Sequence, residues 1–189
     1  MLLFVIAHAA SAEEASLQLV FQPAFMRPDY ALAIPGTKET ILTPARIEGE
    51  DVTFLKKADI ERLKLNLDSI RRVSAASASA ELAKLKPTFV RDGKGVIQYA
   101  LLASDSPATA SATLAPDFAD KFADTFGPDI LVAIPTRYRI YVYPALASHF
   151  QDTAEQVLND YEISGYPVSK EVFRVTPKGL EAIGKFESQ

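Results

Sequence analysis

Two arginines set among tyrosines are the residues of this chain best suited to chemistry. Arg137 and Arg139 flank Tyr138, and Tyr141 and Tyr143 follow at alternate positions. A guanidinium offers a planar fork of N–H donors that binds a carboxylate or phosphate in one orientation. The alternative interpretation is an exposed turn arginine, followed by a strand whose arginine points to solvent. We take Arg137, Tyr138 and Arg139 as ligand-binding candidates.

Residue types that catalytic and metal sites commonly use are scarce. The chain has no cysteine, which excludes a thiolate nucleophile, a disulfide framework, a zinc ribbon and an iron–sulfur site. Its two histidines, His8 and His149, do not form a His-x-x-x-His pair. There is no Gly-x-Ser-x-Gly elbow and no Asp-x-Asp-x-Asp-Gly loop, although the many carboxylates leave a carboxylate metal site open. We therefore predict no metal and no cofactor, and we favour a noncatalytic role over an enzyme.

Composition limits the class of protein and of partner. With 189 residues, of which 48% are hydrophobic and 23% charged, the chain can bury a core in one domain, with or without a small appendage. Its net charge of -4 and lack of clustered Lys and Arg argue against nucleic-acid binding. The expected partner is an unidentified ligand or protein, and the oligomeric state is not predicted.

The first twelve residues are apolar and end in small side chains. Residues 2–10 followed by Ala10-Ser11-Ala12 are typical of the end of a secretory signal peptide, although no Lys or Arg precedes Arg27. The alternative is a buried strand over residues 2–7. A signal remnant implies a secreted or periplasmic protein, and a strand implies a cytoplasmic one. No run reaches the roughly 18 apolar residues of a transmembrane helix.

The candidate arginines lie in a predicted β-hairpin. Residues 129–134 consist of Asp129 followed by a continuous apolar run, which is typical of a strand buried on both faces. Residues 139–143 are rich in Ile, Val and Tyr, which favour a second strand. We expect both arms to be core, so that only the tip, residues 136–139, remains as a place for function.

Other patterned segments predict an α+β fold around this hairpin, with a mostly antiparallel sheet and three main helices packed on it. Apolar residues at helical spacing predict the helices, and short β-rich runs near turn residues predict the added strands. In the second helix a phenylalanine recurs every four residues, a stripe that could line a pocket but favours core. The expected helices are 59–73, 116–126 and 145–163, and the expected added strands are 88–90, 96–102 and 171–175.

The remaining segments carry weaker signals. Frequent prolines predict an irregular β lobe over residues 13–50, followed by the α+β domain over residues 51–189. The Ser and Ala residues of 74–80 allow either a continuing helix or a flexible hinge. The composition of residues 104–115 predicts a surface loop and the main internal boundary, and that of residues 177–184 predicts one closing turn of helix.

Three short motifs suggest a relationship: Asn66-Leu67, Ile134-Pro-Thr-Arg137 and Tyr166-Pro-Val-Ser169. Through them residues of about 55–184 resemble the YtpQ-like family, bacterial proteins that carry a domain of unknown function. In that family the hairpin tip tends to read Pro-Asn-Arg-Asp, so Thr136 and Tyr138 stand here for the Asn and the Asp. The resemblance implies the same α+β order of elements, implies no activity, and adds Tyr166 and Ser169 to the ligand-binding candidates.

These features favour a noncatalytic binding or accessory protein, exported if residues 1–12 are a signal remnant. One alternative is a hydrolase-like enzyme, which requires Arg137 to face a concave site beside an Asp or Glu. The other is a structural module that oligomerises through a sheet edge or through its Phe and Tyr surface.

Overall fold

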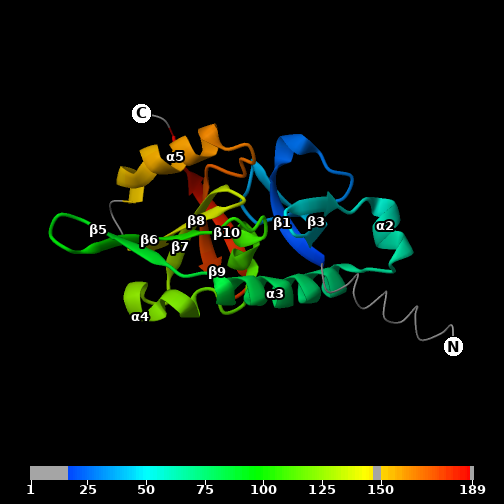
Figure 1. Cartoon of the computed structure of the whole chain (residues 1–189), viewed down its shortest axis with the longest axis horizontal. Coiled ribbons are helices and arrows are strands. Elements are labelled where there is room, and N and C mark those ends of the chain that lie inside the picture. Colours follow the sequence, from blue (N-terminus) through cyan, green and yellow to red (C-terminus); the bar gives the residue numbers. More distant parts are fainter. Residues whose placement is uncertain (1–16, 147–149, 188–189) are drawn as a thin grey trace.

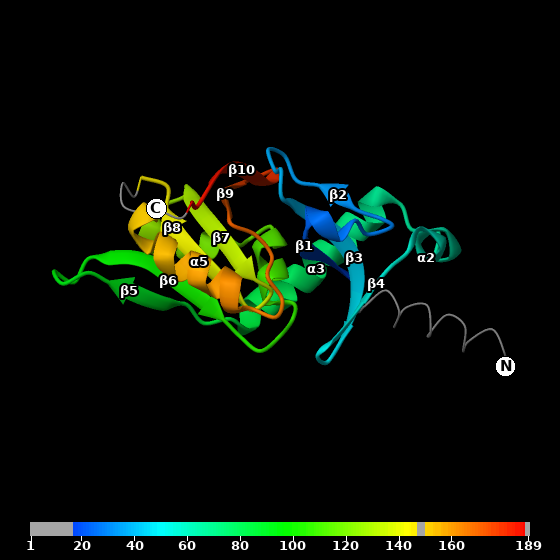
Figure 2. The same cartoon turned by 90° about the horizontal axis from the view of Figure 1, so that it is seen from above.

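Two antiparallel sheets lie side by side in the computed structural model of the chain, which describes residues 17–146 and 150–187 (Figure 1). A long helix runs along both sheets, and a second helix covers the opposite face of the larger one (Figures 1 and 2). The predicted α+β class, with mostly antiparallel strands, is confirmed. Residues 1–12 and both histidines, on which other predictions rest, lie outside the described residues.

The smaller, N-terminal sheet has the order β1-β3-β2, and β4 also pairs with β3. Its strands are β1 (Leu17–Pro23), β2 (Leu32–Ala33), β3 (Thr40–Glu48) and β4 (Asp51–Phe54), with a 3-10 turn, η1 (Ala24–Met26), after β1. Its middle strand β3 tolerates Pro44, which falls between the residues that pair with β2 and those that pair with β4. The Pro44 carbonyl accepts a hydrogen bond from Leu55 N, just beyond the last residue of β4. The N–H that proline lacks would point to the same side of β3, so its absence interrupts no hydrogen bond of the β1–β3 ladder.

The larger sheet has the order β10-β9-β7-β8-β6-β5 and contains every strand predicted around the hairpin. The predicted closing helix over 177–184 is wrong, because Pro177 and Lys178 form a tight turn and the rest of the segment forms β10, which pairs with β9. The strands are β5 (Thr88–Arg91), β6 (Ile97–Ala103), β7 (Ile130–Thr136), β8 (Arg139–Pro144), β9 (Glu171–Thr176) and β10 (Gly179–Lys185).

The first predicted helix, 59–73, is in fact two helices, α2 (Lys57–Arg62) and α3 (Leu67–Lys84). The chain breaks at Lys64, whose φ is 53°. It restarts at Asn66, whose side chain accepts from Ser69 N (2.8 Å) while the Ser69 hydroxyl accepts from Asn66 N (2.9 Å). This capping box is a strong start signal that the periodicity concealed. Of the two possibilities for residues 74–80, the structure shows the continuing helix.

The surface loop predicted over residues 104–115 is also wrong. It contains a 3-10 helix, η2 (Thr109–Leu114), whose first five residues are buried. Ala110 and Ala112 belong to the same core cluster as Ala78 of α3. Small side chains here allow close packing of backbone against helix, rather than marking exposure.

Two further helices are shorter than predicted. Residues 116–126 form turns, a 3-10 turn η3 (Asp120–Phe122) and one turn of helix α4 (Ala123–Phe126), and the third helix consists of η4 (Phe150–Thr153) and α5 (Ala154–Ile163). The core role of the phenylalanine stripe is confirmed, because Phe118 and Phe122 are fully buried.

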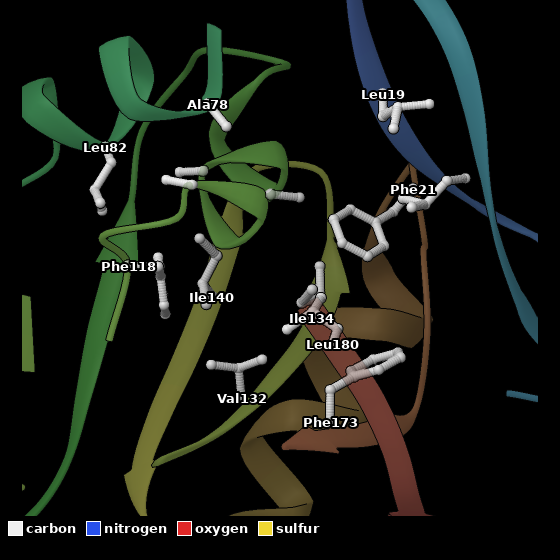
Figure 3. Packing of buried hydrophobic residues seen from close by; sticks show 14 of the residues in the cluster. Leu19, Phe21, Ala78, Leu82, Phe118, Val132, Ile134, Ile140, Phe173 and Leu180 are labelled. Atoms are coloured by element: carbon white, nitrogen blue, oxygen red, sulfur yellow. The ribbon is translucent and has the colours of Figure 1, made fainter. Parts of the chain in front are cut away.

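The hairpin arms carry the core on both faces, as predicted. Every residue of β7 is buried. One face of the hairpin packs with α3, η2 and the N-terminal sheet, and the other packs with α5. Figure 3 shows the first of these clusters, in which Phe21 of β1 meets Phe173 of β9 edge-on with ring centroids 6.4 Å apart. The two sheets therefore share one continuous core.

The loop after β2 covers the edge strand β10. Ala182 N donates to the carbonyl of Pro35 over 2.8 Å. The next residue, Gly36, has a φ of 78°, and a Cβ built there would lie 2.4 Å from the carbonyl oxygen of Ala182. Glycine is therefore needed at this position for two reasons, its positive φ and the close approach of the β10 backbone.

We expect Gly36→Ala to lower the free energy of unfolding by about 2 kcal/mol, because the left-handed backbone and the clash with β10 both oppose the new methyl group. Gly49→Ala is the matched control, since Gly49 has a φ of 64° and no heavy atom lies within 4 Å of the place that its Cβ would take. The control should lose only about 1 kcal/mol. Urea unfolding followed by circular dichroism measures both, and equal losses would contradict the close approach.

Candidate functional site

The tip of the β7–β8 hairpin is held by backbone hydrogen bonds from two other segments. Arg137 N donates to the carbonyl of Tyr166 (3.4 Å), and the Arg137 carbonyl accepts from Ala110 N (2.9 Å). Ser104 N donates to the Tyr138 carbonyl over 3.2 Å. A tip fixed from both sides presents its side chains in defined directions, as a preorganised binding site requires.

Arg137 extends toward the N-terminal sheet and lies against two aromatic rings. Its guanidinium carbon is 5.4 Å from the ring centroid of Phe54 and 5.1 Å from that of Tyr166, within the range of cation–π attraction. Tyr138 packs edge-on against Tyr166, with centroids 5.9 Å apart. Within residues 17–146 and 150–187, the guanidinium has no ion-pair partner and no hydrogen-bond acceptor. Its N–H donors are available to a ligand or to water.

The environment of Arg137 is partly desolvated. Burial lowers the pKa of Arg137 from its usual value, and the nearby phenols of Tyr138 and Tyr166 oppose this shift. The ordinary pKa of arginine is so high that the group stays charged at neutral pH. A positive charge partly removed from water, with no carboxylate paired to it among the described residues, gains more from an added anion than an exposed arginine does.

Arg139 is already paired with a carboxylate. Its Nη1 donates to both carboxylate oxygens of Asp160, over 2.9 and 3.0 Å, and the Tyr141 hydroxyl donates to Oδ2 over 2.7 Å. These hydrogen bonds raise the pKa of Arg139. Burial, reinforced by Asp160, raises the pKa of Tyr141, so that its phenol stays neutral and keeps donating. Arg139 is thus part of a structural network that ties β8 to α5.

A polar cleft of about 570 Å³ opens beside this network. Tyr138 is one of its lining residues and also contacts Tyr166, so it connects the cleft with the surroundings of Arg137. The buried carboxylate in the cleft, Asp160, is the one held by Arg139 and Tyr141. The other polar lining residues are Ser104, Asp105, Thr136, Arg139 and Ser164.

Ser169 lies in a separate buried network between the two sheets. Its hydroxyl accepts from Glu171 N (2.9 Å) and is 2.6 Å from the hydroxyl of Thr40. The Glu171 carboxylate, whose residue is 4% exposed, accepts from Thr40 Oγ1 (2.5 Å), Lys38 N (2.7 Å) and Glu39 N (3.3 Å). Ser169 therefore joins the sheets and takes no part in the contacts of Arg137.

The structure thus brings together three of the five predicted site residues. Arg137, Tyr138 and Tyr166 lie in one cluster, which the aromatic ring of Phe54 completes. Phe54 was missed because it comes from the other sheet, and no local spacing links it to the hairpin. Asp160, the ion-pair partner of Arg139, was missed for a similar reason. It lies on α5, far from Arg139 in the sequence, and its place in the helical pattern is typical of a carboxylate that faces solvent.

Neither a metal-binding cluster nor a membrane-spanning helix is found in the part of the chain that the structure describes. No group of three or more His, Asp or Glu side chains there is arranged to hold a metal ion. No helix among the same residues is long and apolar enough to cross a membrane.

The geometry at the tip is consistent with recognition of an anionic group and specifies no reaction. No protein-family model, no curated protein and no solved structure matches this chain, so its resemblance to the YtpQ-like family stays a prediction.

Proposed function

We propose that this is a noncatalytic binding protein that recognises a carboxylate or phosphate group of its ligand through Arg137. The observation that carries the proposal is the position of the Arg137 guanidinium, against Phe54 and Tyr166 and without an acidic partner among the described residues. Export belongs to the same proposal, because residues 2–12 resemble the end of a signal peptide.

The aromatic neighbours make this arginine different from a solvated one. Contact with Phe54 and Tyr166 limits the side-chain rotamers that must be ordered on binding. The planar fork of N–H donors can then make two parallel hydrogen bonds to two oxygens of an anion, a geometry that an ammonium group does not provide. Since the whole chain has a net charge of -4, attraction of an anion depends on such local positive charge rather than on the overall field.

A catalytic role has less to support it. The hydrolase hypothesis needs an acid beside Arg137, whereas the charged or titratable groups that shift the pKa of Arg137 are the phenols of Tyr138 and Tyr166. The buried acid of the neighbouring cleft, Asp160, accepts hydrogen bonds on both oxygens from Arg139 and Tyr141. A carboxylate so engaged is poorly placed to take a proton from a substrate.

The test follows the side-chain Nε–H signals of the arginines by nuclear magnetic resonance during titration with sodium acetate or sodium phosphate. We expect a saturable shift of the Arg137 signal with at least one of the two anions, and only a weak, non-saturating change with sodium chloride. Because the fork geometry matters, Arg137→Lys should weaken binding, and Arg137→Gln should weaken it about tenfold or more, equivalent to about 1.4 kcal/mol.

The matched control is Arg72→Gln, which removes an exposed arginine of α3 and should leave the titration of Arg137 unchanged. Phe54→Ala should weaken anion binding while the protein stays folded. The proposal is wrong if acetate and phosphate both fail to give a saturable shift at Arg137. It is equally wrong if the Arg137→Gln variant binds as tightly as the unmodified protein, judged from backbone amide signals of residues 136–138.

A further inference from the structure

A second concave surface lies between the two sheets, away from the hairpin tip. It is a cleft of about 590 Å³, within the range of small-molecule sites. Its walls come from β1 and the loop after β2, from α3, from residues 113–120 and from the β9–β10 turn. Several segments that are distant in the sequence therefore form it together.

The deeper part of the cleft is apolar. Five of its lining residues are buried members of the main core cluster, so the core itself forms this wall. Two of them, Leu19 of β1 and Leu180 of β10, are labelled in Figure 3. The five are Leu19, Ile34, Leu42, Ala115 and Leu180. Such a surface favours a hydrocarbon chain or an aromatic ring over a polar ligand.

An unsatisfied hydroxyl lies at the same wall. Ser74 of α3 lines the cleft and is 3% exposed. Its Oγ is buried and has no hydrogen-bond partner in the described part of the protein. A buried hydroxyl without a partner is unfavourable, so a polar group of a ligand that reached it would gain a hydrogen bond and relieve this cost.

The rim of the cleft carries an excess of positive charge. Arg71 lies three residues before Ser74 on α3, which places both side chains on one face of the helix. Lys178 faces the same cleft from the β9–β10 turn. Neither cation has an ion-pair partner within residues 17–146 and 150–187, and Asp120 is the single carboxylate among the lining residues.

We infer that this cleft binds an amphipathic organic anion, a molecule with an apolar chain or ring system and one carboxylate. The apolar part lies against the core wall that contains Leu19 and Leu180. The carboxylate lies on the face of α3 where the Arg71 guanidinium and the Ser74 hydroxyl can both donate to it, and Lys178 adds positive charge from the opposite side. This site is independent of the one proposed at Arg137.

Decanoate, kept below the concentration at which it forms micelles, is the probe. Backbone amide signals of the full chain are followed by nuclear magnetic resonance during the titration, in the Arg137→Gln background so that the hairpin tip does not contribute. We expect saturable shifts at residues 71–75 and 178–180. Decyltrimethylammonium, with the same chain and the opposite charge, should bind about tenfold more weakly or worse.

Variants separate the parts of the proposal. Arg71→Glu should weaken decanoate binding about tenfold or more, whereas Arg72→Glu changes the adjacent exposed arginine, makes the same change in net charge, and should leave the Kd within about twofold. Ser74→Ala should raise the midpoint of thermal unfolding, because it removes the unsatisfied hydroxyl, and yet weaken decanoate binding about threefold or more. A hydroxyl without a ligand role would give the first effect alone.

Three results would overturn the inference. The first is absence of a saturable shift at residues 71–75 and 178–180 with decanoate. The second is equal affinity for decanoate and decyltrimethylammonium, which would mean that the rim charge plays no part. The third is equal weakening by Arg71→Glu and Arg72→Glu. The anion site proposed at Arg137 does not affect these outcomes, because every protein in this experiment carries Arg137→Gln.

Discussion

Replacing Glu171 with alanine is expected to lower the free energy of unfolding by about 3 to 5 kcal/mol. Its buried carboxylate accepts hydrogen bonds from Lys38 N, Glu39 N and Thr40 Oγ1. The substitution would leave Lys38 N and Glu39 N without this acceptor, would leave the Thr40 hydroxyl with Ser169 alone, and would open a cavity between the two sheets. Because the donors all belong to the N-terminal sheet and its loop, the loss should appear first as separation of that sheet from β9.

Urea unfolding followed by circular dichroism measures this effect, and amide hydrogen exchange at residues 38–40 locates it. Glu181→Ala is the matched control, since Glu181 is an exposed glutamate of the neighbouring strand β10 and should change the free energy by about 0.5 kcal/mol or less. Glu171→Gln keeps the shape and one acceptor oxygen, so its loss should be smaller than that of the alanine variant. A loss below about 1 kcal/mol for Glu171→Ala would contradict the role assigned to this network.

The second large effect is expected at Asp160, where alanine should cost about 3 kcal/mol. The Arg139 guanidinium would lose both of its hydrogen bonds to the carboxylate, and the buried Tyr141 hydroxyl would lose its acceptor. This expected loss lies at the low end for a broken buried ion pair, because the Arg139 side chain is 47% exposed and can be hydrated again.

Thermal and urea unfolding of Asp160→Ala are compared with those of Asp105→Ala, which removes an exposed aspartate lining the same cleft. The control should be nearly neutral. Combining Asp160→Ala with Arg139→Met in a double-mutant cycle isolates the ion pair, since the methionine removes the charge that the first substitution leaves unpaired. If the two changes were additive, the Arg139–Asp160 pair would contribute nothing to the free energy of unfolding, which would contradict the role given to it here.

The two networks explain why the five predicted site residues have different roles. Arg139 faces α5 and forms an ion pair with Asp160, and Ser169 faces the N-terminal sheet and contacts Thr40. Arg137, two positions from Arg139, meets aromatic rings instead of an acid. It keeps its donors available for this reason, and the proposed function depends on it.

Local patterns predicted the elements whose residues interact with near neighbours in the sequence. The hairpin around β7 and β8 could be recognised from its apolar runs, and strands β5 and β6 from short β-rich runs near turn residues. The phenylalanine stripe was correctly assigned to the core even though most of its residues are not in a regular α-helix. Burial follows from hydrophobicity and survives an error in the type of element.

The errors fall where distant contacts override local preference. Residues 109–113 are small and polar enough to suggest a loop, yet they are buried because α3 and the hairpin tip close over them. Residues 179–185 contain apolar residues at a spacing that allows a helix, but β9 offers a free edge, and pairing with it satisfies the backbone groups.

Periodicity and turn chemistry within short segments were enough to establish the α+β class, the central hairpin and an arginine-rich tip. Folding in three dimensions was needed to show which arginine is available, which acid is buried between the sheets, and which residues form the cleft beside Ser74. Each of these depends on partners separated by tens of residues in the chain. Pairing of charges and satisfaction of buried polar groups are settled by distance in space, and a sequence pattern carries no measure of that distance.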